Sequence, residues 1–333
     1  MASQPNGVAY VEKVPASQPI PPIDIPSVLR FPVAAFLNMM ISGILYSFTS
    51  NIGAGDLASV SRRRDEWWEI LLVFGAKIAE LAVGWFGEYD GYDMASLTFL
   101  AHLPTNFLLF YFYHIRPSTV VFSLVTDIIS TYVPFYLLRP LAPVHYAEAP
   151  RGAVANRFII NDFPILIYTT LLAAGIHGIV LFASFTTWLP IHLVLYFDGI
   201  RDISFVHESQ LPWLILASIP TGLAARTFLF SPAAGAKRDL GDIKNLAFKP
   251  ETATLSETIY YNLWGYSKRT RTLIQRTAIL AATIGLYTWF QIWFTVDGTE
   301  WTGAAGWGAV WSAATTLTGA AFWWVTDVSG IAN

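Results

Sequence analysis

Long apolar stretches recur along the chain, and their lengths predict helices that cross a membrane. Phe31 to Ser47, Phe163 to Gly175 and Thr277 to Val296 contain no Asp, Glu, Lys, Arg or His. A mainly apolar stretch of about 18 residues or more is long enough to cross a bilayer as an α-helix. Because only helices and closed barrels satisfy their own backbone hydrogen bonds in lipid, several such stretches in one chain indicate a polytopic membrane protein.

The pattern predicts an all-α transmembrane bundle of eight or nine helices. The eight longer expected helices cover residues 28–50, 67–86, 95–115, 118–138, 163–185, 211–230, 272–296 and 304–325. A ninth apolar segment, Trp188 to Phe197, is short for a crossing. Its length is compatible with a short spanning helix, a re-entrant segment or an interfacial helix.

The distribution of Lys and Arg favours nine crossings. The most basic loops are 51–66, with three consecutive arginines at 62–64, and 231–271. Basic loops mark the cytoplasmic side, and nine crossings place both on the same side, whereas eight place them on opposite sides. We therefore expect nine crossings, with the N-terminus outside and the C-terminus inside. The loop at 139–162 opposes this arrangement, because its three arginines would then lie outside.

The domain organisation follows from the same pattern. Residues 1–27 contain six prolines and predict a flexible, partly extended N-terminal tail. Residues 28–326 form the transmembrane domain, and 231–271 are a polar cytoplasmic segment inserted within it. Residues 327–333 form a short C-terminal tail.

One part of the polar segment predicts an amphipathic helix. Thr254 and Glu257 have the spacing of a capping box, and Leu255, Ile259 and Leu263 recur every four residues. Such a helix, followed by basic residues, is typical of a segment that lies on an anionic membrane surface. Packing of this helix against the bundle is the alternative.

Composition agrees with the membrane interpretation and excludes several other classes. Hydrophobic residues make up 54% of the chain and charged residues 13%, with a mean hydropathy of +0.47; soluble domains average about 25% charged residues. The net charge of −3 argues against a nucleic-acid partner. The chain has no cysteine, which excludes disulfides and thiolate metal sites, and its six histidines do not pair at metal-ligand spacing.

Polar side chains within or beside the expected helices are candidates for an intramembrane polar or ion pathway. Lys77 and Glu80 lie three residues apart on one helix face and are expected to pair. A charge deep in a bilayer costs several kcal/mol unless it is paired or hydrated, so these groups should face the bundle interior. Asp127, as a lone buried carboxylate, would have a raised pKa or would need a cation such as Lys77. Seven residues make up the candidate set: Glu69, Lys77, Glu80, His102, Asn106, Asp127 and His177. The alternative is a neutralised group that fixes helix packing.

A second, acidic set of candidates follows two of the expected helices. It consists of Glu88, Asp90, Asp93, Asp198 and Asp202. Nine crossings put both halves on the same face, where carboxylates can hold Mg²⁺ and a diphosphate. This arrangement is similar to that of membrane-embedded prenyltransferases and terpene cyclases, and the resemblance implies a Mg²⁺-dependent isoprenoid or lipid enzyme. The first motif, at residues 88–93, only approximates the Asn/Asp-rich D-x-x-D motif of those families. Solvated acidic loops are the competing interpretation.

We therefore favour a non-enzymatic endomembrane protein, either a small-solute or proton-coupled carrier or a membrane scaffold. Its expected partners are the lipid bilayer and either a small solute or other membrane helices, with no nucleic acid and no cofactor. The Mg²⁺-dependent enzyme is the alternative, and Mg²⁺ is expected only in that case. The sequence does not identify a substrate or a compartment.

Overall fold

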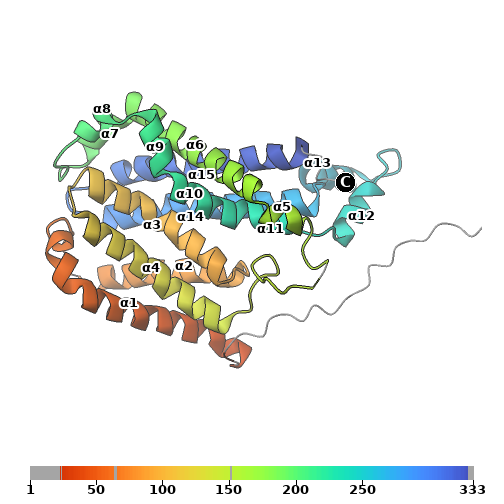
Figure 1. Cartoon of the computed structure of the whole chain (residues 1–333), viewed down its shortest axis with the longest axis horizontal. Coiled ribbons are helices and arrows are strands. Elements are labelled where there is room, and N and C mark those ends of the chain that lie inside the picture. Colours follow the sequence, from red (N-terminus) through yellow and green to blue (C-terminus); the bar gives the residue numbers. More distant parts are fainter. Residues whose placement is uncertain (1–22, 24, 64–65, 151, 329–333) are drawn as a thin grey trace, which may run out of the picture.

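In the part of the chain that the structure describes, seven long helices of 20 residues or more run along one bundle, a bent run of short helices lies alongside them, and the other short helices lie towards the two ends (Figure 1). The computed structural model describes residues 23, 25–63, 66–150 and 152–328. The long helices are α1 (Ser27–Ala58), α2 (Trp67–Phe86), α3 (Gly91–Tyr111), α4 (Pro117–Leu138), α6 (Phe163–Thr186), α14 (Lys268–Thr295) and α15 (Trp301–Val328). The shorter ones are α5 (Arg157–Asn161), α7 (Leu189–Tyr196), α8 (Ser204–Glu208), α9 (Leu211–Ala217), α10 (Ile219–Ala225), η1 (Arg226–Phe230), α11 (Ser231–Gly235), α12 (Leu240–Leu246) and α13 (Leu255–Trp264).

The described residues form helices and no strands, as predicted, and four of these helices are long and apolar enough to cross a membrane. A bent pair, Leu211–Ala217 with Ile219–Gly235, raises this number to five if it counts as one span. The pair bends by 49° at its break around Ser218, and Pro220, directly after the break, cannot donate the backbone hydrogen bond that a continuous helix would need there. The four helices are Ser27–Phe48 of α1, α4, α6 and α14.

Helix α3 is the most deeply buried of the four long helices α1 to α4. It lies between α4 and α14 in the bundle. The Trp307 indole of α15 donates a hydrogen bond to the carbonyl of Pro104 in α3, at 3.0 Å. Thr105 of α3 also bonds Gln291 of α14, at 3.1 Å between side-chain oxygens. These contacts join the N-terminal and C-terminal halves of the chain into one core.

Small residues allow α14 and α15 to approach closely. A Cβ atom at Gly308 would lie 2.7 Å from the Gly285 carbonyl oxygen of the facing helix. Real Cβ atoms do not come this close, so the position requires glycine. Small residues at helix interfaces serve the same purpose in membrane proteins generally.

Some predicted boundaries agree with the structure and others do not: α3, α14 and α15 begin three or four residues before the expected starts, and the helix expected at 211–230 is divided into α9, α10 and η1. The helices expected at 67–86, 118–138 and 163–185 begin and end within one residue of α2, α4 and α6. Helix α1 continues through the expected loop to Ala58. The segment Trp188 to Phe197 forms only the eight-residue α7. At 1.5 Å per residue it covers about 12 Å, too short to cross a hydrocarbon core of about 30 Å, so the expected ninth crossing is wrong.

The two basic loops lie at opposite ends of α14, contrary to the nine-crossing expectation. Arg62 donates its backbone N–H to the Thr295 carbonyl at the C-terminal end of α14. Arg271, in the first turn of α14, pairs with Asp239 at 2.8 Å. The loop at 139–162, which opposed the earlier count, lies at the same end as Asp239, because the Ala155 N–H bonds the Gly235 carbonyl. The charge count failed because basic residues occur at both ends of the bundle.

Most of the expected N-terminal tail and the last residues of the expected C-terminal tail lie outside the described residues. The beginning of the described chain sits at the end of the bundle where α4 ends, since the Ile23 N–H bonds the Leu137 carbonyl. Helix α15 ends at the same end of the bundle, beside α12 and α13 (Figure 1).

Candidate functional site

Four charged or titratable side chains from three helices meet in the bundle interior, and we call them the buried polar cluster: Lys77, Glu80, His102 and Asp127. The ammonium of Lys77 lies 2.9 Å from Glu80 Oε2. The Lys77 side chain is 17% exposed, and the Glu80 side chain is fully buried. The predicted pairing of Lys77 with Glu80 is confirmed. Its origin is local, because residues three apart share a helix face.

His102 of α3 connects the two carboxylates of the buried polar cluster. Its Nε2 atom lies 3.3 Å from Glu80 Oε2, and its Nδ1 atom lies 2.9 Å from Asp127 Oδ2. The contact between His102 Nδ1 and Asp127 Oδ2 has the distance of an ion pair, but its angles are not those of a hydrogen bond. With His102 protonated, the positive charges of His102 and Lys77 balance the negative charges of Glu80 and Asp127. The buried polar cluster then has no net charge.

Hydroxyl and amide groups surround the buried polar cluster. Thr98 donates to Glu80 Oε1 at 2.8 Å, and Thr131 lies 3.4 Å from the Lys77 ammonium. Asn38 of α1 donates to the Thr131 hydroxyl at 3.2 Å. The Tyr287 ring of α14 packs on the His102 imidazole, with ring centres 4.6 Å apart. Five long helices, α1, α2, α3, α4 and α14, thus enclose the buried polar cluster, and its polar groups contact one another.

The other three members of the predicted polar set lie apart from the buried polar cluster. Glu69 accepts from the Glu66 N–H and caps the start of α2. Asn106 donates to the His102 carbonyl, one helical turn below. His177 bonds the Ala173 carbonyl within α6 at 2.9 Å and faces Thr318 of α15. The structure therefore brings together four of the seven candidates.

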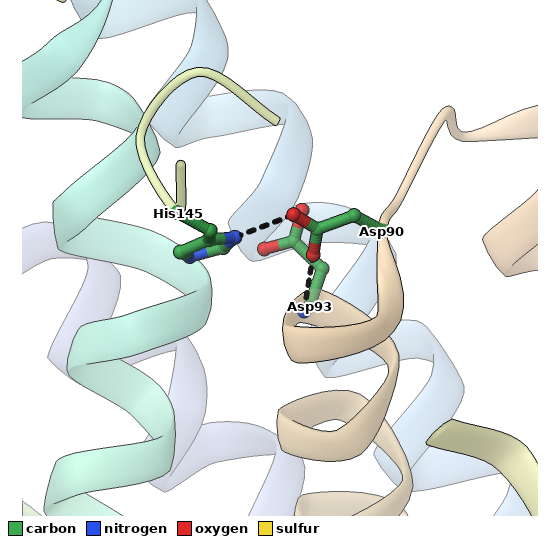
Figure 2. A group of neighbouring side chains, drawn as sticks. All are labelled: Asp90, Asp93 and His145. Carbon is green, nitrogen blue, oxygen red and sulfur yellow. Dashed lines mark hydrogen bonds and ion pairs between the residues drawn. The ribbon is translucent and has the colours of Figure 1, made fainter. Parts of the chain in front are cut away.

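A second charged group lies near one end of the bundle, where Asp90 and Asp93 at the start of α3 meet His145 from a loop (Figure 2). Asp90 Oδ1 accepts from the Asp93 N–H at 2.9 Å and caps the N-terminus of α3. Asp90 Oδ2 accepts from the Ala142 N–H at 2.9 Å and lies 2.7 Å from His145 Nδ1. Asp93 forms a two-pronged pair with Arg276 of α14, at 2.7 and 2.8 Å.

Asp90, Asp93 and His145 have the residue types and separations of a metal-binding group, with ligand atoms within 4.8 Å of one another. Each of the four carboxylate oxygens already accepts at least one N–H hydrogen bond. A cation would have to displace the Arg276 guanidinium from Asp93. The donor set therefore fits a structural ion-pair network better than a metal site.

Burial and hydrogen bonding act in opposite directions on the pKa values of Asp90 and His145. Burial raises the pKa of Asp90, but hydrogen bonds from His145 and two backbone N–H groups outweigh it and leave the pKa below its usual range. Burial lowers the pKa of His145, and the bond to Asp90 reverses this and raises the pKa above its usual value. Asp93, Arg276 and the Tyr92 ring also face this pair.

The pair of His145 with Asp90 predicts a pH-dependent stability. Its contribution is fully present below the unfolded-state pKa of His145, about 6.5, and is lost as the pH rises through the higher folded-state pKa. His145→Gln should therefore lower the free energy of unfolding by about 1–3 kcal/mol at pH 6, and by less above the folded-state pKa. Thermal unfolding of both proteins from pH 5.5 to 9 measures this. A mutational effect that does not change with pH would contradict it.

The two halves of the predicted acidic motif lie at opposite ends of α14. Asp93 contacts Arg276 near the start of this helix, and the Asp198 N–H bonds the Gly298 carbonyl just beyond its end. Asp202 accepts from the Ser204 N–H and hydroxyl and is 3.5 Å from His114. Glu88 is exposed in the turn after α2. The separation leaves no single place for a shared Mg²⁺ and diphosphate.

Contacts between segments far apart in the chain leave no signal in a single sequence. His145 and Arg276 had not been singled out, because their partners Asp90 and Asp93 lie on other elements. A buried arginine, Arg226, was also missed. From the π-helical turn η1, Arg226 donates to the Ile160 carbonyl of α5 at 2.6 Å and to the Thr169 hydroxyl of α6 at 3.2 Å. An Arg within an otherwise apolar stretch is a usable signal for such a site.

The helical fold and its apolar spans define a membrane-associated protein. Residues 162–325 match the family model described as the Bouquet formation protein 3 C-terminal domain, which covers just under half of the chain. No curated protein and no solved structure matches the chain. The matched region begins one residue before α6 and ends in the last turn of α15, so it contains two of the four candidate spans and the bent pair.

Proposed function

We propose that the protein is a polytopic membrane scaffold of the nuclear envelope that acts in bouquet formation. The observation that carries this proposal is the match of 162–325 to the Bouquet formation protein 3 C-terminal domain, a description related to the nuclear envelope and telomeres. The apolar helices within that region support a location in the membrane itself.

In this proposal the chain crosses the membrane eight times. The crossings are α1, α2, α3, α4, α6, the bent run from α9 to α11, α14 and α15. An even number of crossings places the first and last residues of the bundle on the same side of the membrane. Ile23 and the end of α15 lie at the same end of the bundle, in agreement with this. That end also carries the basic residues of 139–162 and 231–271, so we assign it to the cytoplasmic and nucleoplasmic side.

The buried polar cluster supports a scaffold over a carrier. Its carboxylates are paired with Lys77 and His102, and hydroxyls bond the cluster, so it holds helices α2, α3 and α4 together. A carrier needs an aqueous path from such groups to one membrane face. A cavity of about 240 Å³ between α3, α4, α9 and α10 is lined by Asn106 and Thr221 with mostly apolar side chains, and none of the four cluster residues lines it.

The proposal is tested by locating the full chain in cells and removing it. A fluorescent fusion should give a rim around the nucleus, and alkaline carbonate should not extract the protein from membranes. Cells without the protein should show reduced telomere clustering at the envelope. Normal clustering together with a location away from the nuclear envelope would overturn the proposal.

A further inference from the structure

The cavity of about 240 Å³ between α3, α4, α9 and α10 opens sideways from the bundle, and we call it the side cavity. The start of α3 contacts Arg276 near the start of α14, whereas the side cavity lies beside the C-terminal half of α3, towards the other end of the bundle. Thr221 and Trp311 in its wall are 2% and 4% exposed, but Val121 of α4 is 56% exposed. The side cavity therefore has a closed inner wall and a rim on the outer surface of the bundle.

The lining of the side cavity is mainly apolar, and none of the described residues that form it is charged. Aromatic rings come from α3 and α15, namely Phe107, Phe110, Tyr111 and Trp311. A charged headgroup would find no partner here, and burying it unpaired would be costly. A dry apolar cavity of about 150 Å³ admits a benzene ring, so the side cavity has room for about two fused rings.

Four polar groups in the wall of the side cavity have hydrogen-bonding capacity that the described part of the chain does not use. The hydroxyls of Ser218 and Thr221 make no hydrogen bond with described residues, although both residues are buried. Asn106 donates to the His102 carbonyl at 2.9 Å, but its amide oxygen accepts no hydrogen bond from them. The Trp311 indole N–H is also buried without a partner there. Because buried polar groups are normally paired, this wall favours a ligand that both donates and accepts.

We propose that the side cavity binds a membrane sterol, which enters from the surrounding lipid between α4 and α9. The sterol hydroxyl donates to the Asn106 amide oxygen and accepts from the Thr221 hydroxyl, while the flat ring system packs on the aromatic side chains. A rigid ring system loses less conformational entropy on binding than an acyl chain, and an acyl chain has no donor for Asn106. The inference rests on the proposed function in one respect, that α4 and the bent run from α9 to α11 cross a bilayer.

Binding of tritiated cholesterol to the full chain in a neutral detergent, read by scintillation proximity, tests this site. The unlabelled competitors are cholesterol, its methyl ether, which cannot donate a hydrogen bond, and dioleoylphosphatidylcholine, which offers acyl chains. The test variant Thr221→Val removes the hydroxyl and keeps the branched shape of the side chain. Thr170→Val on α6 is the matched control, because the Thr170 hydroxyl is also buried without a partner in the described chain and does not line the side cavity.

A second pair of variants tests the opening of the side cavity and leaves its inner wall unchanged. Ala217→Phe places a ring at the rim, at an exposed position where the larger side chain is compatible with folding. Leu216→Phe is its control, since Leu216 is 55% exposed on the same helix and does not line the side cavity. Ala217→Phe should lower the affinity for cholesterol about tenfold or more, and Leu216→Phe should lower it less than about twofold.

Cholesterol should bind saturably, and the methyl ether and phosphatidylcholine should compete about tenfold less well or worse. Thr221→Val should lose about five- to tenfold in affinity and Thr170→Val less than about twofold, because one neutral hydrogen bond is lost. Equal losses in the two threonine variants, or equal competition by the methyl ether, would overturn the site. Competition by phosphatidylcholine as strong as that of cholesterol would replace the sterol with an acyl chain.

The sterol assay is independent of the localisation test, because it needs no nuclear envelope. Absence of saturable binding by a protein that gives a nuclear rim would overturn the sterol site alone. Saturable binding by a protein that gives no rim would overturn the proposed function and leave the sterol site standing.

Discussion

Replacing Lys77 by methionine should destabilise the folded protein by about 3–5 kcal/mol, because it leaves Glu80 as a fully buried carboxylate that has lost its ammonium partner. Thr98 and His102 still contact Glu80, but neither carries the permanent charge of a lysine. The midpoint of unfolding in a detergent or nanodisc denaturation series measures the loss.

A second change should distinguish a neutralised pair from a group with another role. The double variant Lys77→Met with Glu80→Gln removes both charges and should recover part of the stability. Removing both charges of a buried pair costs less free energy than leaving one of them buried without its partner. Because the sequence suggests Lys77 as a cation for Asp127, Asp127→Asn is the other candidate for the compensating change. The structure favours Glu80→Gln, because Asp127 lies against His102. A double variant no more stable than Lys77→Met would contradict the pairing.

Replacing Arg276 by methionine should produce a loss of similar size, about 3–5 kcal/mol. Arg276 holds both oxygens of Asp93, whose side chain is fully buried, and also donates to the Phe228 carbonyl at 3.0 Å. Its guanidinium lies over the Tyr89 ring, 4.8 Å from the ring centre. Thermal unfolding of the purified protein measures the effect.

Arg276→Lys is the matched control, since it keeps the charge and loses the planar fork. It should retain part of the stability but not all of it, because a lysine cannot donate to both oxygens in the same geometry. Full stability in Arg276→Met would show that the contact between α3 and α14 does not depend on this ion pair. Because Arg276 lies in 162–325 and Asp93 does not, the pair also joins the family-matched region to the rest of the chain.

The features that follow from local pattern were predictable, and those that follow from tertiary contact were not. The boundaries of α2, α4 and α6 agree because apolar length is a local signal, and Pro117 and Pro164 also mark the starts of α4 and α6. The pairing of Lys77 with Glu80 agrees because helix geometry brings positions three apart together. His145 and Asp90 come from separate elements, and a single sequence contains no spacing that links them.

The side assignments failed for a physical reason that is visible in the arrangement of α14. The positive-inside rule counts charges in loops, and Arg62 at one end competes with Lys237 and Arg238 at the other. A short apolar segment such as α7 has the hydropathy of a span without its length, so it shifted the count by one. Only the path of the chain decides which loops share an end.

Labelling from the two sides of the membrane tests the central claim most directly, namely that the chain is a polytopic membrane protein with its two loop-bearing ends in different compartments. The chain has no native cysteine, so Arg62→Cys and Lys249→Cys each introduce a single thiol at an exposed position. A membrane-impermeant maleimide added to the cytoplasmic side of sealed membranes should label the cysteine at 249 and leave that at 62 unlabelled until the membrane is opened. Labelling of both positions from the same side would contradict the account.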